Sequence, residues 1–264
     1  MLLHVADAVS QGHTKVSIRT VDTDVVILAV TAFGRLNTEE LWVVFGTGKN
    51  FRFLAAHEMA VALGPNKCRG LSFFHAFTGC DNVSCFGGKG KTTAWETWKA
   101  SDDVTDITAT FGALANFPNH SDIDKFMDNL ERFVVLMYDR TSSQEHVNEA
   151  RKHLFAKKGR SIENIPPIRE ALRQHVKRAS YQAGFCWAQM MVCTPEFPSP
   201  SDWGWVHSEN GWDTCWTTLS EATVACRQLL RCGCKKGRTG QCKCVKASLQ
   251  CTALCWCGGD CSRE

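Results

Sequence analysis

Residues 15–30 read KVSIRTVDTDVVILAV, and this stretch decides the fold that we expect for the first part of the chain. It ends in six consecutive apolar residues, Val25 to Val30, as in strands that are buried on both faces of a parallel sheet. A second segment of this kind, LWVVFGTG at 41–48, closes on glycines. Helical patterns alternate with these strands, so residues 1–115 predict an α/β core, a partly parallel sheet flanked by helices.

Helical patterns surround and follow these strands. One ends near residue 11, and another, AAHEMAVALG, stops at Gly64 and Pro65. From Ser121 the apolar residues recur every 3.6 positions, which predicts a helical region over 121–192, with further helices at 143–157 and 168–192.

Residues 193–226 are rich in proline, glycine and tryptophan. Large aromatic side chains need partners to pack against, so we expect an ordered loop followed by a helix. The tryptophans that should hold this loop to the helices are Trp203, Trp205, Trp212 and Trp216.

Charge is unevenly distributed along the 264 residues. The net charge is +3, but the last 38 residues carry eight Lys and Arg against Asp260 and Glu264. Such a basic end favours nucleic acid as a partner. We find neither a secretory signal pattern nor an apolar run long enough to span a membrane, so we expect no membrane partner and an intracellular, reducing location, the nucleus.

Two acids stand close together in TVDTDVVIL. Asp22 and Asp24 are two residues apart, so at the start of the expected strand their side chains would share one face. Carboxylates held that close repel each other unless a cation lies between them, and hard cations such as Mg²⁺ or Mn²⁺ prefer oxygen ligands. The alternative is that the pair only forms a turn and caps an element.

A third acid precedes a glycine-rich turn in FTGCDNVSCFGGKGKTTAW, residues 77–95. Asp81 follows Gly79 and Cys80, and glycines and lysines alternate further on. Backbone N–H groups and lysines at such a turn bind phosphate without reading base sequence. The residues that we expect to contact nucleic acid there are Gly88, Lys89, Gly90 and Lys91.

In their order, VDTDVVIL, LWVVFGTG, FHAFTGCD and GGKGKTTA resemble the C-terminal half of the PIN-like, flap-endonuclease (XPG-type) nuclease core. The resemblance covers roughly residues 1–100. It implies that Asp22, Asp24 and Asp81 are ligands of one of two metal ions. It also implies a helix-hairpin-helix at Gly88, Gly90 and Ala94, with Lys89 and Lys91 on phosphate. The chemistry would be Mg²⁺- or Mn²⁺-dependent phosphodiester hydrolysis by an endonuclease or exonuclease.

One departure from that family bears on activity. Its further carboxylates precede the D-x-D segment, and here their positions would fall at or before Met1. We therefore expect an incomplete metal site and impaired catalysis. A P-loop NTPase is an alternative, because CFGGKGKT at 85–92 matches the phosphate-loop pattern at Gly90, Lys91 and Thr92, but Cys85 replaces its first glycine.

Cysteines crowd the end of the chain in the spacing C-x-C-x7-C-x-C-x6-C-x3-C-x-C-x3-C. Paired thiolates favour zinc, and a disulfide knot is the alternative. The expected ligands are Cys232, Cys234, Cys242, Cys244, Cys251, Cys255, Cys257 and Cys261.

This tail, 230–264, resembles the tesmin/TSO1-like CXC domain, in which nine cysteines hold three zinc ions. Arg238 stands where the ninth is expected, so the resemblance implies two or three ions. The lysines expected on phosphate are Lys235, Lys236, Lys243 and Lys246. The whole combination also resembles a group of transposon-associated proteins of animal genomes.

These observations predict a DNA-binding protein with a nuclease-type core and a zinc-binding tail, and no small-molecule cofactor. The alternative from another class is a non-enzymatic, zinc-dependent DNA-binding or chromatin-type module, in which the core is only a scaffold.

Overall fold

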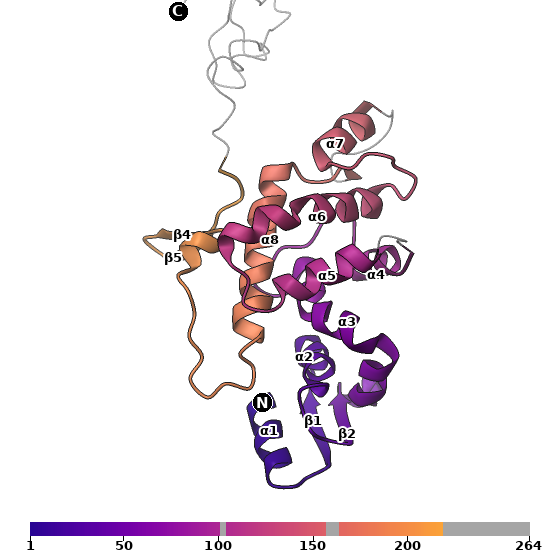
Figure 1. The fold of residues 1–264 in the computed structure, drawn as a ribbon, viewed down its shortest axis with the longest axis vertical. Coiled ribbons are helices and arrows are strands. Elements are labelled where there is room, and N and C mark those ends of the chain that lie inside the picture. Colours follow the sequence, from indigo (N-terminus) through magenta and orange to yellow (C-terminus); the bar gives the residue numbers. More distant parts are fainter. Residues whose placement is uncertain (101–103, 157–163, 219–264) are drawn as a thin grey trace, which may run out of the picture. The chain divides into compact units, whose positions relative to one another are not determined.

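The sheet of the first domain is small and mixed. In the computed structural model, which describes residues 1–100, 104–156 and 164–218, it has the order β1-β2-β3. Figure 1 labels β1 and β2, which lie side by side. Its strands are β1 (Lys15–Thr20), β2 (Glu40–Phe45) and β3 (Arg52–Ala55). β1 and β2 are parallel, and β3 returns antiparallel to β2 after the short η1 turn (Gly48–Asn50). The mixed α/β class and the strand expected at 41–48 are confirmed.

The strand predicted at Val25 to Val30 is wrong, because this run lies in helix α2 (Thr23–Phe33). A continuous apolar run does not distinguish a buried strand from a buried helix. The start signal is Asp22, whose side chain accepts a hydrogen bond from the Asp24 N–H group and caps the helix. The D-x-D segment therefore lies between the end of β1 and the start of α2.

Helices enclose the rest of this region. α1 (Leu2–Ser10) agrees with the expected helix end near residue 11. The expected stop at Gly64 and Pro65 is a kink inside α3 (Ala56–Phe77), where Gly64 has φ 75° and helix resumes directly after it. α2 and α3 pack against each other and against β2, and Figure 1 shows them beside the sheet.

The second half of the described chain is helical, as expected. Its helices are α4 (Lys91–Ala100), α5 (Val104–Leu114), α6 (Ile123–Tyr138), α7 (Val147–Ala156) and α8 (Arg169–Tyr181), with 3-10 turns η2 (His120–Asp122) and η5 (Pro200–Trp203) and a π-helical turn η4 (Gln182–Trp187). The helices expected at 143–157 and 168–192 are present but shorter. The core lies where Phe73 and Phe77 of α3 meet Phe111 of α5 and Phe133 of α6.

The tryptophan-rich segment is ordered but contains a hairpin, β4 (Trp205–Ser208) and β5 (Gly211–Thr214). Trp203 is buried against Tyr181 and Phe185. Trp212 and Trp216 are exposed, so only part of the expected packing forms. The helix expected towards residue 226 falls mostly outside the described residues. No helix in the described part of the chain is long and apolar enough to cross a membrane.

Candidate functional site

The D-x-D segment occupies the carboxyl end of a parallel strand. β1 ends at Thr20, whose carbonyl accepts the Gly46 N–H group at 3.0 Å, so the ends of β1 and β2 are joined there. Asp22 is exposed, and one of its oxygens accepts the Asp24 N–H group at 2.8 Å. In open α/β sheets, ligands bind outside the carboxyl ends of the strands. The carboxyl edge, our name for Asp22, Asp24 and their surroundings, therefore lies where a site is expected.

The carboxylate of Asp24 is held by a histidine of α3, which the sequence did not identify as its partner. His75 Nε2 lies 2.7 Å from Asp24 Oδ1, and the imidazole is buried near Trp187. Burial lowers the pKa of His75 more than its hydrogen bond to Asp24 raises it. A neutral imidazole then donates its Nε2 proton and fixes the Asp24 carboxylate.

Asp81 lies in a tight turn just after α3. The backbone of Cys80 bonds that of Val83 in both directions, and Gly79 has φ 109°, where a Cβ atom would come 2.8 Å from Cys85 Cβ. Asp81 is exposed and has no ion pair or side-chain hydrogen bond within the described part of the chain. None of the described residues therefore engages its carboxylate.

The three predicted carboxylates share a neighbourhood but not a closed cluster. Burial raises the pKa of the Cys80 thiol, and the Asp24 carboxylate adds to that rise, so Asp24 acts on the residue next to Asp81. In the described ranges, however, Asp22, Asp24 and Asp81 do not form a group whose ligand atoms all lie within 4.8 Å of one another. The convergence expected around one cation is not present at that distance, and the metal-ligand roles stay predictions.

The glycine-lysine segment forms a second turn, Phe86–Lys89, and then enters α4, where Ala94 is buried. Gly88 has φ 65°, which favours glycine. Lys89 is partly exposed, with its ammonium 5.3 Å from the centre of the Tyr138 ring.

Lys91 is engaged inside the protein. Its ammonium donates to the carbonyls of His75 and Gly79 and to Thr78 Oγ1, so its three N–H donors are engaged at the end of α3. Burial lowers its pKa. Lys91 therefore supports the turn that carries Asp81 instead of offering a free charge to phosphate. Because this segment follows a helix and not a strand, the context required of a P-loop is also missing.

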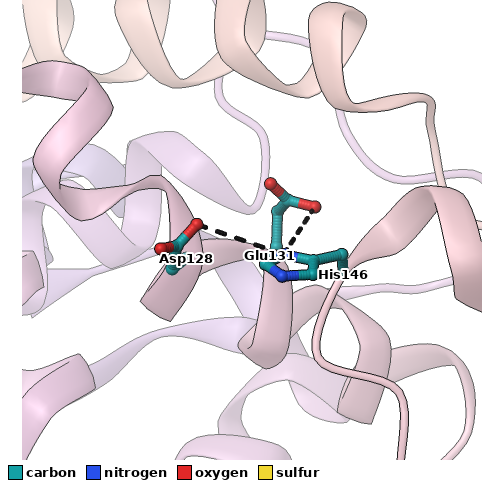
Figure 2. A group of neighbouring side chains, drawn as sticks. All are labelled: Asp128, Glu131 and His146. Carbon is teal, nitrogen blue, oxygen red and sulfur yellow. Dashed lines mark ion pairs between the residues drawn. The ribbon is translucent and has the colours of Figure 1, made fainter.

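A different group of possible ligands does converge. Asp128, Glu131 and His146 have ligand atoms that all lie within 4.8 Å of one another, and Figure 2 shows them facing each other. We name them the acid–histidine cluster. Glu131 lies four residues after the buried Met127, so both side chains belong to the apolar stripe of α6. An acid at such a core-facing position is the signal in the sequence from which the cluster could have been found.

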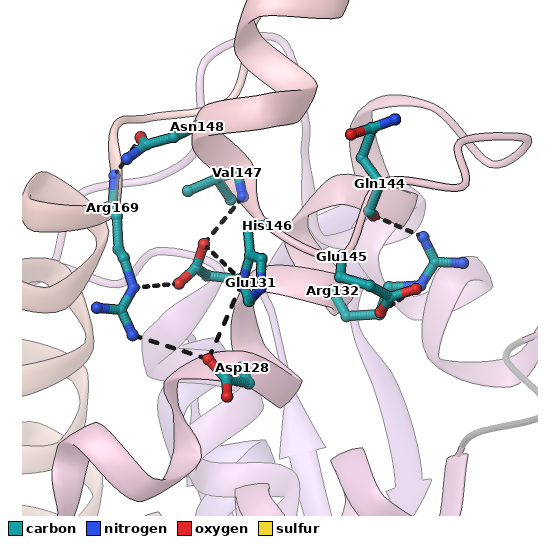
Figure 3. Close-up of polar contacts among 9 residues, drawn as sticks. All are labelled: Asp128, Glu131, Arg132, Gln144, Glu145, His146, Val147, Asn148 and Arg169. Carbon is teal, nitrogen blue, oxygen red and sulfur yellow. Dashed lines mark hydrogen bonds and ion pairs between the residues drawn. The ribbon is translucent and has the colours of Figure 1, made fainter.

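The contacts of Glu131 identify this cluster as structural. Its two oxygens face Arg169 Nε at 2.5 Å and the Val147 N–H group at 2.9 Å, while His146 Nδ1 lies 3.6 Å away (Figure 3). Asp128 lies 3.7 Å from the same guanidinium. The buried acid thus caps α7 and joins α6 to the start of α8, and its oxygens are already used.

The cysteine-rich tail lies outside the described residues. This holds for the eight cysteines, for Arg238 and for the four lysines, so zinc and phosphate binding there stay predictions. Comparisons with protein-family models, curated proteins and solved structures found no match to this chain.

Proposed function

We propose that this chain is a nucleic-acid-binding protein with a metal-dependent phosphodiesterase site of the PIN-like, flap-endonuclease type at its carboxyl edge. One observation carries the proposal: the D-x-D segment lies at the carboxyl end of a parallel strand, and the histidine bonded to Asp24 belongs to the helix that leads directly to Asp81. Segments about 60 residues apart in sequence thereby supply acids to one neighbourhood.

The donor set suits Mg²⁺ or Mn²⁺. Asp22 and Asp24 each have one oxygen with no hydrogen-bond partner in the described ranges, and Asp81 has both. These are hard oxygen ligands. A bound ion would activate water and neutralise charge on phosphate. The protein's own part is to hold Asp22 by its capping bond and Asp24 by His75, and to offer Asp81 from a glycine-dependent turn.

The tail supplies the second half of the proposal. Its paired cysteines are soft ligands suited to zinc, and its lysines suit phosphate. Nucleic-acid binding should then weaken steeply with added salt. The competing function, a non-enzymatic DNA-binding module, is favoured by the spread of the three carboxylates and by the structural use of Lys91.

A cleavage assay with isosteric variants separates the two functions. In line with the impaired catalysis expected above, we expect the chain to cut single-stranded or flap DNA slowly, and in Mg²⁺ or Mn²⁺ only. Asp22→Asn keeps a capping oxygen, and we expect it and Asp81→Asn to lose on the order of 100-fold in rate or in Mn²⁺ affinity measured by electron paramagnetic resonance. Asp106→Asn, an exposed acid on α5, is the matched control. A folded, DNA-binding chain that neither binds Mn²⁺ nor cuts DNA would establish the non-enzymatic function.

The zinc prediction needs its own measurement. Elemental analysis of the purified chain should find two or three zinc ions per molecule, and removing them should weaken DNA binding. A folded chain that binds DNA equally well without metal would contradict the zinc-binding tail.

A further inference from the structure

An exposed group of basic and aromatic side chains lies next to the carboxyl edge. It is formed by the segment after β2 together with the end of β1, and its members, which we name the basic-aromatic patch, are Arg19, Lys49, Phe51 and Phe53. The strand register places Arg19 opposite Val44 and Val44 opposite Phe53, so these three share one face of the sheet. Arg19 precedes Asp22 by three residues.

The two phenylalanines are unusually open to solvent. Phe51 is 42% exposed and Phe53 is 62% exposed, and their rings meet edge to face with centres 5.4 Å apart. A single exposed apolar residue needs no explanation, but a pair of large rings set among cations is a recognisable binding surface. Exposed rings of this kind offer flat faces for stacking.

The cations of the patch have no acidic partner. The Arg19 guanidinium lies 5.8 Å from the Phe51 ring centre. Arg52, in contrast, pairs with Phe45 and lies over its ring, on the other face of the sheet, so it is not part of the patch. In the described ranges, Arg19 and Lys49 have no carboxylate within the 4.0 Å of an ion pair. Two unpaired positive charges beside a pair of exposed aromatic rings are complementary to a polyanion that also carries flat apolar faces.

We propose that the basic-aromatic patch binds single-stranded nucleic acid, with bases stacked on Phe51 and Phe53 and phosphates paired with Arg19 and Lys49. Proteins that bind single strands combine a basic groove with aromatic side chains in this way. A duplex hides the base faces that the rings need, which makes the unpaired strand the better partner.

The position of the patch deepens the proposed function, because it names the form of the nucleic acid that would approach Asp22. Gly46 lies in the segment that leads from β2 into the basic-aromatic patch, and its N–H group donates to the carbonyl of Thr20. Thr20 is the last residue of β1, the strand that precedes the D-x-D segment. The relation to cleavage rests on the proposed function, whereas binding at the patch can be measured without cleavage.

The test uses the full chain with its four tail lysines changed to alanine, in buffer without Mg²⁺ or Mn²⁺. Fluorescence anisotropy with a labelled oligothymidine should show that Phe51→Ala/Phe53→Ala weakens binding roughly tenfold or more, with little change for a duplex of equal length. Phe53→Trp should retain binding. Phe155→Ala, on an exposed phenylalanine of α7, is the matched control and should bind normally.

Two further readouts locate the contact. A photoreactive thymidine analogue in the oligonucleotide should crosslink to the peptide that contains Phe51 and Phe53. Lys49→Ala should reduce the slope of log affinity against log salt by about 0.7, the value for one phosphate of a single strand, whereas Arg140→Ala should not.

The outcomes separate this inference from the proposed function. Binding within twofold of wild type for the double phenylalanine variant, or crosslinks confined to other peptides, would overturn the patch even if Asp22→Asn stops cleavage. Ring-dependent binding by a chain that cuts no DNA would support the patch and reject the nuclease.

Discussion

The carboxyl edge and the acid–histidine cluster are built from the same side-chain types, and each uses a carboxylate to cap a helix. Asp22 caps α2 with one oxygen and stays exposed, while Glu131 caps α7 with one oxygen, gives the other to Arg169 and is fully buried. The acid–histidine cluster is the more compact of the two, yet both oxygens of its buried Glu131 already accept hydrogen bonds. A carboxylate oxygen without a hydrogen-bond partner therefore identifies a possible metal site better than the closeness of several possible ligands does.

The largest expected effect is a loss of stability in acid that involves a buried histidine. His175 on α8 is buried, with Nε2 2.8 Å from the Phe77 carbonyl at the end of α3. Burial lowers its pKa to about 4. The unfolded chain then binds a proton first, so stability is retained above pH 6.5 and lost as the pH falls towards 4.

At about 1.4 kcal/mol per pKa unit, this loss amounts to roughly 3 kcal/mol. His75, whose pKa is also lowered, adds to it in the same direction. Urea unfolding between pH 7 and 4 measures the loss, and His175→Gln, which keeps a donor, should flatten the profile. An unchanged slope in this variant would contradict the assignment.

Glu131→Ala should give the next largest effect. It removes the cap of α7 and leaves Arg169 only its longer contact with Asp128. We expect this to cost about 2–3 kcal/mol, below the range for a fully buried pair because Arg169 is half exposed. Chemical unfolding measures the loss. Glu131→Gln retains an acceptor and should cost less.

The same variants test the reading of the cluster. If the acid–histidine cluster is structural, Glu131→Gln leaves Mn²⁺ binding unchanged while Asp22→Asn reduces it. The reverse result would make the cluster the metal site and leave the carboxyl edge as a capping feature.

Lys91→Met should cost about 1–2 kcal/mol, because polar groups at the end of α3 lose their donor. Lys89→Met is the matched control from the same turn and should cost less, since it loses only a partly exposed contact with Tyr138. Thermal unfolding measures both. A stable Lys91→Met variant with strongly weakened DNA binding would restore the phosphate role.

The smallest expected effect distinguishes capping from metal binding at Asp22. Asp22→Ala should destabilise the chain by about 1 kcal/mol, and Asp22→Asn by only a few tenths, because asparagine caps a helix as well as aspartate does. Chemical unfolding without metal measures both. Equal losses for the two variants would show that the charge, and not the cap, is what stabilises α2.

The comparison also explains which parts of the molecule the sequence predicted. The strand at 41–48 and the amphipathic stripe of α6 were predicted because half-buried or strongly periodic elements carry their own signal. The run from Val25 to Val30 was misassigned because α2 is buried on much of its surface, which leaves no polar period to read. The missed β3 is only four residues long, and two of them are exposed.

The candidate site divides in the same way. Asp22, Asp24 and Asp81 were recognised by type, order and spacing, which are properties of the chain alone. The bond from His75 to Asp24, the engagement of Lys91 and the satisfaction of Glu131 by Arg169 join residues 12 to 51 positions apart. The number of hydrogen bonds that a side chain can donate or accept is fixed by its own chemistry. Packing decides which of these donors and acceptors are left without a partner. The sequence by itself therefore determined which side chains offer chemistry, and only the tertiary structure decided which of them remain available to a ligand.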